Sequence, residues 1–348
     1  MRGTSHIYIN GRFLCQQATG VQKFALGTAL ALQKKHPEII VISPKGKHNS
    51  HGLRLKQSGI GRGFIWEQLW LPLYLWLHPH SLLINFCNSA PLLIKNQIVS
   101  IHDLAFLKKP EWFKPGFRKW YRFLIPRICK KSLRIATVTE FIKDEIIKTY
   151  AVSPEKIIIL SNGIPKMEFD ENKPFPYKYL LLTGIYNPRK NAGFVLSLLP
   201  EIKKKDIHIV GVGADTTVFA KVEFLQDENL HLLKYVDEKQ YYTLMKHAEA
   251  LAFPSEYEGF GIPVLEALIM NTPAIVPDIE VYRESFADLP LYYTLNDSKS
   301  FLQAVERINI HKPNSNELTF LKNKFNFEAS VEILSELINN NISKKIKH

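Results

Sequence analysis

Short apolar runs alternate with amphipathic segments along the first half of the chain. Residues 7–10 and 39–43 are short and rich in β-branched side chains, which is typical of buried strands, and residues 19–36 carry apolar side chains at helical spacing. Gly20 lies at the turn between the first strand and this helix. Residues 44–63 show neither pattern, and we predict a mobile loop there. Further strands are predicted at residues 82–86, 97–101, 135–139 and 156–160, with a helix at 141–150.

A second strand–helix series follows residues 164–177, a polar, proline-rich stretch that we interpret as a linker between domains. Such alternation is typical of doubly wound parallel sheets. We therefore predict two α/β domains, residues 1–165 and 166–327, and a C-terminal helix and tail, residues 328–348, that packs back on the first domain. The predicted strands of the second series are residues 179–184, 207–211, 230–233, 250–253 and 274–276, with a turn at 211–213 and helices ending near 204, 248, 286, 310 and 339.

Composition narrows the class of protein. A chain of 348 residues with 46% hydrophobic and 22% charged residues has the make-up of a globular protein. The net charge of +12 indicates a negatively charged partner, which could be nucleic acid, an anionic membrane or a phosphorylated substrate. Three widely spaced cysteines without a CxxC pair argue against a disulfide framework or a zinc site. Because the chain also starts without a signal-peptide pattern, we expect a cytoplasmic protein.

Residues 108–134 hold the densest positive charge. This segment contains ten Lys or Arg residues and one acidic residue, Glu111. Six Trp, Phe or Tyr residues are interleaved with the basic ones. Basic and aromatic residues at helical spacing are typical of a helix that lies on an anionic membrane surface. The alternative is a solvated basic face above an ordinary core stripe, and both interpretations stay open.

The most informative stretch follows the predicted strand at residues 250–253. Gly259 and Gly261 allow a tight loop, and Pro263 then suits the first turn of a helix. Glu258 precedes the loop, and Glu266 lies just inside the helix. Amides at a helix start favour an anion, and carboxylates accept hydrogen bonds from hydroxyls, so a ligand with phosphates and hydroxyls is indicated. The alternative is a simple turn whose glutamate complements the helix dipole.

Two further groups of candidates follow predicted strands. Arg189 and Lys190 place two cations at a strand end, where they could bind phosphate, although such pairs are also common on surfaces. His102, followed by Asp103, ends the strand predicted at residues 97–101. A histidine at this position is either a catalytic group or a satisfied structural one.

The framing of the two glutamates, Pro-Ser-x-x-Glu-Gly-Phe-Gly-x-Pro-x-Leu-Glu-Ala, resembles the signature of the family 4 retaining glycosyltransferases, which have the GT-B fold. Residues 184–191 resemble the diphosphate-binding element of that family, and residues 19–24 resemble its first glycine loop, with Lys23 and Phe24 as mild departures. The segments at residues 10–13, 66–69, 86–91 and 137–141 are similar to members that assemble bacterial polysaccharides. The resemblance covers residues 5–290.

This resemblance implies two Rossmann-like domains that face each other across a cleft, the first on the acceptor side and the second binding a nucleotide sugar. Glu266 would accept from ribose hydroxyls and Glu258 from sugar hydroxyls, while His102 would position the sugar. Arg189 and Lys190 would neutralise the leaving phosphate. The remaining donor-binding positions implied are Gly20, Gly184, Phe260, Gly261 and Ile262.

The reaction implied is retaining transfer of a sugar from GDP-mannose, dTDP-rhamnose or a UDP-sugar to a saccharide, expected to be lipid-linked, in lipopolysaccharide O-antigen or capsule synthesis at the inner face of the plasma membrane. No Asp-x-Asp motif occurs, so we expect no metal and no resident cofactor. A nucleotide-sugar hydrolase or epimerase on the same fold and a lectin-like module are alternatives. A basic nucleic-acid-binding protein is a third, but nucleic acid is not the expected partner because the charge is concentrated in one aromatic-rich segment.

Overall fold

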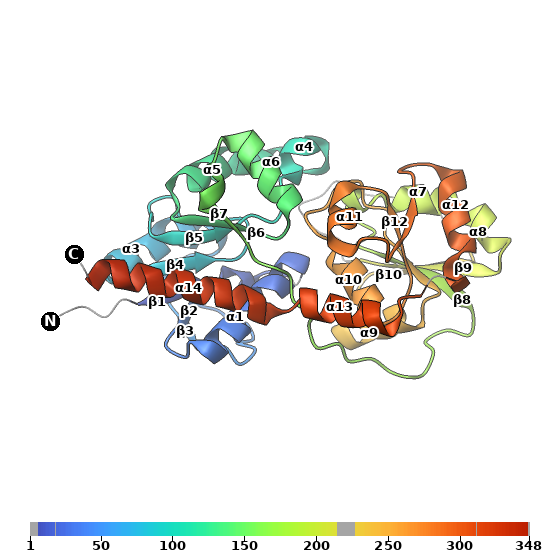
Figure 1. The fold of residues 1–348 in the computed structure, drawn as a ribbon, viewed down its shortest axis with the longest axis horizontal. Coiled ribbons are helices and arrows are strands. Elements are labelled where there is room, and N and C mark those ends of the chain that lie inside the picture. The colour runs from blue at the N-terminus through green and yellow to red at the C-terminus, as the bar shows by residue number, and fades with distance from the viewer. Residues whose placement is uncertain (1–5, 18, 214–226, 311, 347–348) are drawn as a thin grey trace. The chain divides into compact units, whose positions relative to one another are not determined.

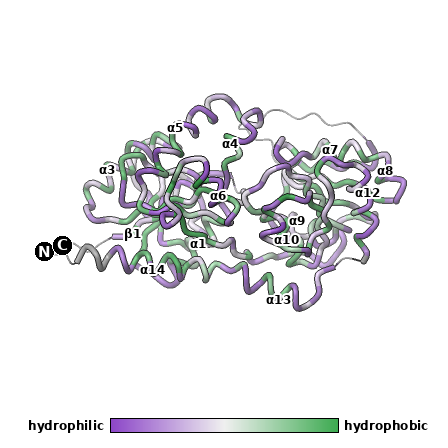
Figure 2. The backbone as a smooth tube through the Cα atoms, turned by 45° about the horizontal axis from the view of Figure 1, so that its top comes forward, coloured by the Kyte–Doolittle hydropathy of each residue, from purple (hydrophilic) through white to green (hydrophobic). Residues whose placement is uncertain are grey.

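The computed structural model describes residues 6–17, 19–213, 227–310 and 312–346, and the chain divides into two compact units (Figure 1). The N-terminal unit comprises residues 1–104, 120–165 and 325–348. The C-terminal unit comprises residues 105–119 and 166–324. The central strands of both units consist largely of buried apolar residues. Figure 2 shows the hydropathy of each residue along the backbone.

The N-terminal unit is built on seven parallel strands in the order β3-β2-β1-β4-β5-β6-β7. The order reverses between β1 and β4, and in doubly wound sheets the carboxyl ends of the strands at such a point form the usual ligand site. The strands are β1 (Ile7–Asn10), β2 (Ile40–Ser43), β3 (Leu55–Gln57), β4 (Leu82–Asn85), β5 (Gln97–Ser100), β6 (Arg134–Thr137) and β7 (Ile157–Ile159).

Helices connect these strands and cover the sheet. Helix α1 (Gly20–Lys35) starts at a capping box between Thr19 and Gln22. The C-terminal helix α14 (Phe327–Ile346) packs along α1, and Gly27 lets this happen because a Cβ there would lie 2.1 Å from the ring of Phe327. The others are α2 (Gly63–Ile65), a π-helical turn (Trp66–Trp70), α3 (Leu71–Trp76), α5 (Pro115–Lys131), which begins in the C-terminal unit, α6 (Glu140–Tyr150) and short 3-10 turns at Gly11–Cys15 and Pro154–Lys156.

The C-terminal unit holds a second parallel sheet, in the order β10-β9-β8-β11-β12-β13, which reverses between β8 and β11. Its strands are β8 (Lys178–Thr183), β9 (Ile207–Val212), β10 (Leu230–Leu233), β11 (Ala250–Ala252), β12 (Ala274–Pro277) and β13 (Leu291–Tyr293). Its helices are α4 (Ala105–Lys108), α7 (Ala192–Ser197), α8 (Leu199–Lys203), α9 (Glu238–His247), α10 (Ile262–Ile269), α11 (Glu280–Phe286), α12 (Ser298–Glu306) and α13 (Ser315–Lys324), with 3-10 turns at Pro110–Trp112, Pro188–Lys190 and Ile308–Ile310.

Four local predictions need correction. The stretch at residues 44–63 contains β3, which the pattern misses because two of its three residues are exposed at the sheet edge. Gly211 lies inside β9, where it pairs with Leu182, rather than in a turn. The helix expected to end near residue 204 is two helices, since α8 begins at Leu199 with Pro200 in its first turn. The basic stretch at residues 108–134 is likewise interrupted by a 3-10 turn before α5 begins at Pro115.

Strand β13 and helix α13 were not predicted at all, because the first is three residues long and the second has only Leu321 buried. None of the helices in the described part of the chain is long and apolar enough to cross a bilayer. Cys15, Cys87 and Cys129 are free thiols.

Candidate active site

The carboxyl ends of β8 and β11 bring two predicted loops together. The two strands are parallel neighbours, with Leu182 opposite Ala252, so the segments that follow them leave the sheet at the same edge. Residues 184–191 follow β8, and residues 253–261 follow β11. These two segments contain the site residues predicted for the C-terminal unit, apart from Ile262 and Glu266. Those two residues lie in α10.

The loop after β8 is ordered by its own backbone. Gly184 has a φ of +68°, a conformation that favours glycine, and its N–H donates to the carbonyl of Val212 at 2.7 Å. The side chain of Asn187 accepts from the N–H of Arg189 at 3.1 Å and thereby caps the 3-10 turn Pro188–Lys190. Arg189 and Lys190 are thus held on a fixed turn at the end of the strand.

The carboxylate of Glu258 forms ion pairs with both cations. The Nζ of Lys190 lies 2.6 Å from its Oε1, and the Nη2 of Arg189 lies 3.6 Å from its Oε2. Burial alone would raise the pKa of the Glu258 carboxyl, but the charges of Arg189 and Lys190 outweigh it, so the pKa lies below its ordinary value. The ammonium group of Lys190 also lies 4.1 Å from the centre of the Phe253 ring. The site therefore contains two cations for one buried carboxylate.

Helix α10 begins beside this cluster. Gly261 is its N-cap with a φ of +112°, and a Cβ at this position would lie 2.8 Å from the ring of Tyr282. The carbonyl of Gly261 accepts from the N–H groups of Val264 and Leu265. Phe260 is buried, with its ring edge on Phe286. Only glycine satisfies both the backbone angle and the close approach, so the loop geometry depends on Gly261.

Glu266 lies inside α10 and is only 2% exposed. Its two carboxylate oxygens accept hydrogen bonds from the hydroxyls of Tyr241 and Tyr242, each at 3.0 Å. Burial and the adjacent carboxylate raise the pKa of both phenols, so both remain protonated donors. No motif marks these tyrosines, so they were not predicted from the sequence. Their one signal is a place on the helix that precedes the signature.

His102 follows β5 in the N-terminal unit. The backbone N–H of His102 donates to the side-chain oxygen of Asn88 at 2.6 Å. The ring Nε2 of His102 lies 2.7 Å from the carbonyl oxygen of Phe86. A carbonyl only accepts, so Nε2 carries the proton. Burial lowers the pKa of the ring, which is therefore neutral near pH 7, and its Nδ1 is an acceptor. The ring edge contacts Phe24 of α1, the helix that Gly20 begins.

A buried network at the reversal point of the N-terminal sheet was also missed. Glu67, in the π-helical turn, is 1% exposed and accepts from Asn10 at 2.9 Å and from the hydroxyl of Ser89. The Nε of Arg12 lies 3.2 Å from the same carboxylate. Asn10 also donates to Asn85, so the ends of β1 and β4 are joined here. From the sequence, these segments were noted only for their resemblance to polysaccharide-assembling members, and no role was predicted for them.

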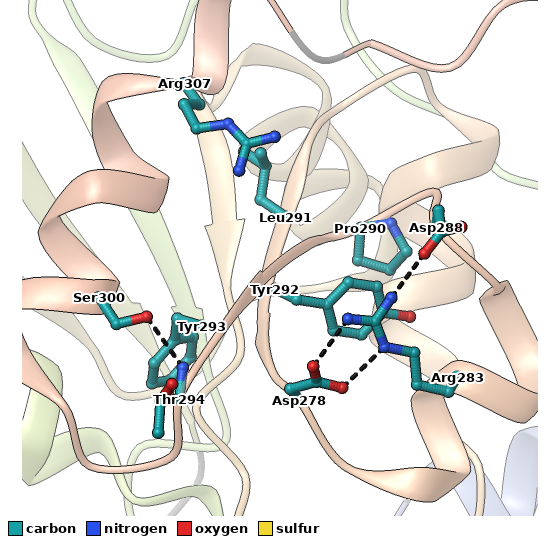
Figure 3. Close-up of a pocket in the computed structure, with 10 residues that line it drawn as sticks. All are labelled: Asp278, Arg283, Asp288, Pro290, Leu291, Tyr292, Tyr293, Thr294, Ser300 and Arg307. Carbon is teal, nitrogen blue, oxygen red and sulfur yellow. Dashed lines mark hydrogen bonds and ion pairs between the residues drawn. The ribbon is translucent and has the colours of Figure 1, made fainter.

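The C-terminal unit also contains a cavity of about 450 Å³ along β13 (Figure 3). Arg283 pairs with Asp278 and Asp288 on one side of it, and Ser300 lies on the other. None of the predicted site residues lines this cavity.

Family models match both halves of the chain. Residues 18–166 match the model described as Glycosyltransferase Family 4, and residues 164–318 match the model described as Glycosyl transferases group 1. The chain belongs to glycosyltransferase family 4. This confirms the family that the signature around Glu258 and Glu266 indicated.

Curated relatives of this family 4 member include the O-antigen chain mannosyltransferase RfbU of Salmonella typhimurium, which is 32% identical over 64% of this chain and 63% of its own length. The serotype-specific mannosyltransferase WbdA of Escherichia coli is 23% identical over 67% of this chain and 32% of its own length. The chain thus spans less than two thirds of either relative.

Among solved structures, Anabaena Alr3699/HepE in complex with UDP-glucose superposes with a TM-score of 0.73, at 11% identity, over 97% of this chain and 99% of that chain. At this identity the likeness concerns the fold alone. Together with the two parallel sheets, it confirms a GT-B fold of two Rossmann-like domains.

Proposed function

We propose that this family 4 member is a retaining glycosyltransferase that moves a sugar from a nucleotide-diphosphate sugar to a saccharide acceptor. The observation that carries the proposal is the cluster of Arg189, Lys190 and Glu258 at the carboxyl edge of the parallel sheet, beside the start of α10. Cations held on a fixed turn beside a helix start are groups suited to bind a diphosphate.

The chemical role of the cations follows from where charge develops. As the bond to the sugar breaks, the departing diphosphate gains negative charge, and fixed cations stabilise that charge more in the transition state than in the bound substrate. Glu258 holds Lys190 in place before the donor arrives, which lowers the cost of reorganisation. With two such cations supplied by the protein, we propose that the reaction does not require a metal.

The other predicted residues complete the proposed donor site. In the C-terminal unit, the Glu266 carboxylate would bind the ribose hydroxyls. In the N-terminal unit, the Nδ1 of His102 would accept from a sugar hydroxyl. Glu258 is ion-paired and is therefore a poor nucleophile. This supports a retaining reaction in which the leaving phosphate takes the proton of the acceptor, without a covalent sugar–protein intermediate.

The relatives guide the choice of substrates. RfbU and WbdA are both named mannosyltransferases, and RfbU is named for the O-antigen chain. We accordingly propose a mannose donor, GDP-mannose, and a lipid-linked oligosaccharide acceptor of the O-antigen type.

A donor panel tests this proposal. GDP-mannose, dTDP-rhamnose, UDP-glucose and UDP-galactose are added separately to the purified chain, and thermal unfolding is recorded with each. The matched donor stabilises the fold by mass action, by about 2.7 kcal/mol at a hundredfold excess over its Kd. The product is then analysed with and without a mannose-terminated acceptor. Release of free mannose at the same rate in both would favour a hydrolase, and no stabilisation by any donor would contradict the proposal.

A further inference from the structure

Exposed apolar side chains are concentrated in one stretch of the N-terminal unit. In the described part of the chain, six of the twelve large hydrophobic side chains that are exposed lie between residues 60 and 77. Their exposed fractions run from 45% for Leu73 to 80% for Ile60, and the other four are Ile65, Leu69, Trp76 and Leu77.

These side chains form a stripe. Residues 63–76 run through α2, the π-helical turn and α3, and the joining residues Trp66 and Trp70 keep helical angles. Ile65, Leu69 and Leu73 recur every four residues, and this spacing places them on one face. The opposite face buries Trp66 and Leu71 in the core of the unit, against Tyr8 and Leu83. The side chains of the exposed stripe therefore do not contribute to the hydrophobic core of the unit.

The stripe has no exposed carboxylate beside it in sequence. The one acidic residue between residues 60 and 77 is Glu67, which is buried and paired with Arg12. Arg62, just before the helical stretch, is exposed. A partner that combines an apolar region with negative charge would fit such a surface.

Helix α5 packs against the same helical stretch through an aromatic contact. The ring of Phe64 lies 5.4 Å from that of Trp120, which stacks on Phe123, and Phe123 is 44% exposed. Arg122 and Arg127 are exposed on the same helix. The apolar residues Leu124, Ile125 and Ile128 of α5 are buried, so α5 presents charge, whereas residues 60–77 present the apolar side chains.

We infer that residues 60–77 are a membrane-docking surface that inserts its apolar stripe into the headgroup region of an anionic bilayer, with Arg62, Arg122 and Arg127 contacting lipid phosphates. Apolar side chains flanked by cations, with Trp at the edge of the stripe, are the features of a helix that lies in a membrane interface. The inference does not depend on the proposed transferase activity.

The experiment uses the full chain and vesicles of phosphatidylglycerol and phosphatidylethanolamine, with phosphatidylcholine vesicles as the neutral surface. Binding is measured by co-sedimentation at low and high salt. The double variant Leu69→Ser, Leu73→Ser removes two exposed side chains, and the matched control is Leu30→Ser, Phe320→Ser, at exposed positions in α1 and α13. Thermal melts of all three proteins verify folding.

We expect the unaltered chain to bind anionic vesicles more strongly than neutral ones. The Leu69, Leu73 double variant should bind about a hundredfold more weakly, since each inserted leucine contributes about one order of magnitude. The control should bind like the unaltered chain. Addition of vesicles should also shift tryptophan fluorescence to shorter wavelength, and Trp76→Phe should reduce the shift.

Equal binding by the Leu69, Leu73 double variant and the unaltered chain would overturn the inference. So would a chain that ignores vesicles but forms a dimer that the double variant abolishes, because the stripe would then be an interface between two copies. Neither result concerns nucleotide-sugar binding, so failure here is distinguishable from failure of the proposed function.

Discussion

Two buried glutamates, one at the carboxyl edge of each sheet, have the same kind of partner but different surroundings. Glu67 in the N-terminal unit pairs with Arg12, and Glu258 in the C-terminal unit pairs with Arg189 and Lys190. Glu67 also accepts from neutral donors on two other segments, those of Asn10 and Ser89, so its cluster balances one cation against one carboxylate. The Glu258 cluster has one cation more.

From this difference we interpret the Glu67 ion pair as structural, and we propose ligand binding only for the Glu258 cluster. The side chain of Arg12 is 7% exposed, whereas those of Arg189 and Lys190 are 18% and 13% exposed, so an incoming anion can reach the latter pair more readily. A neutral, saturated cluster holds segments together. We expect the more exposed cations of the Glu258 cluster to contact a ligand.

The largest expected effect concerns stability. Glu67→Gln leaves Arg12 buried without a carboxylate, and removal of one partner of a buried pair costs about 3–5 kcal/mol of unfolding free energy. Urea unfolding followed by circular dichroism measures it. Glu332→Gln is the matched control, because its exposed pair with Lys35 contributes about 1 kcal/mol or less. If Glu67→Gln kept full stability and lost donor or acceptor binding instead, the contrast between the two glutamates would be wrong.

Next in size is the loss of turnover in Arg189→Ala. Removing one group that stabilises developing charge typically lowers kcat by about 10²–10³. The melting temperature should change little, because Lys190 still pairs with Glu258. Steady-state kinetics with the matched donor tests this, with Lys204→Ala, whose side chain is 76% exposed, as the control. Unchanged kcat in Arg189→Ala would contradict the assignment of Arg189 and Lys190 to the active site.

A third buried carboxylate extends the comparison, since Glu266 has neutral donors, the phenols of Tyr241 and Tyr242. Tyr241→Phe removes one hydrogen bond to a charged group, worth about 1.5–3 kcal/mol. If Glu266 binds the ribose, the carboxylate is held less firmly in the variant than in the unaltered chain. The Kd of the nucleotide should then rise about tenfold, while kcat changes less. Isothermal titration with the free nucleotide measures this, and Tyr235→Phe, at an 80% exposed position, is the control. Equal affinities in both variants would assign the tyrosines a purely structural role.

What the sequence could predict follows from the range of each signal. Local signals, such as Gly261 and Pro263 before α10 or the apolar run of β8, act within a few residues. The signature loop and the other strands of both sheets were predicted from such signals, whereas the short edge strands β3 and β13 were missed. The partners of Glu67 lie 22 to 57 positions away, so spacing could not connect them. The outward stripe of residues 60–77 was missed for another reason: the stretch is apolar on both faces, and the pattern alone does not tell which face the core takes.

The smallest expected effect is a pH dependence at His102, where burial outweighs the opposing charge of Asp103. Its pKa in the folded protein is lowered by burial, so the unfolded chain, with an ordinary pKa near 6.5, binds the proton more readily. The contribution of the neutral ring to stability is therefore complete above about pH 6.5 and is lost as the pH falls through the lower folded value. Thermal melts from pH 7.5 downwards should show this loss, and His102→Gln, which keeps a donor for the carbonyl of Phe86 but does not titrate, should lose less stability over the same interval. Parallel pH profiles for the two proteins would mean that the His102 ring is not held neutral by burial, and its Nδ1 would then no longer be the acceptor proposed for a sugar hydroxyl.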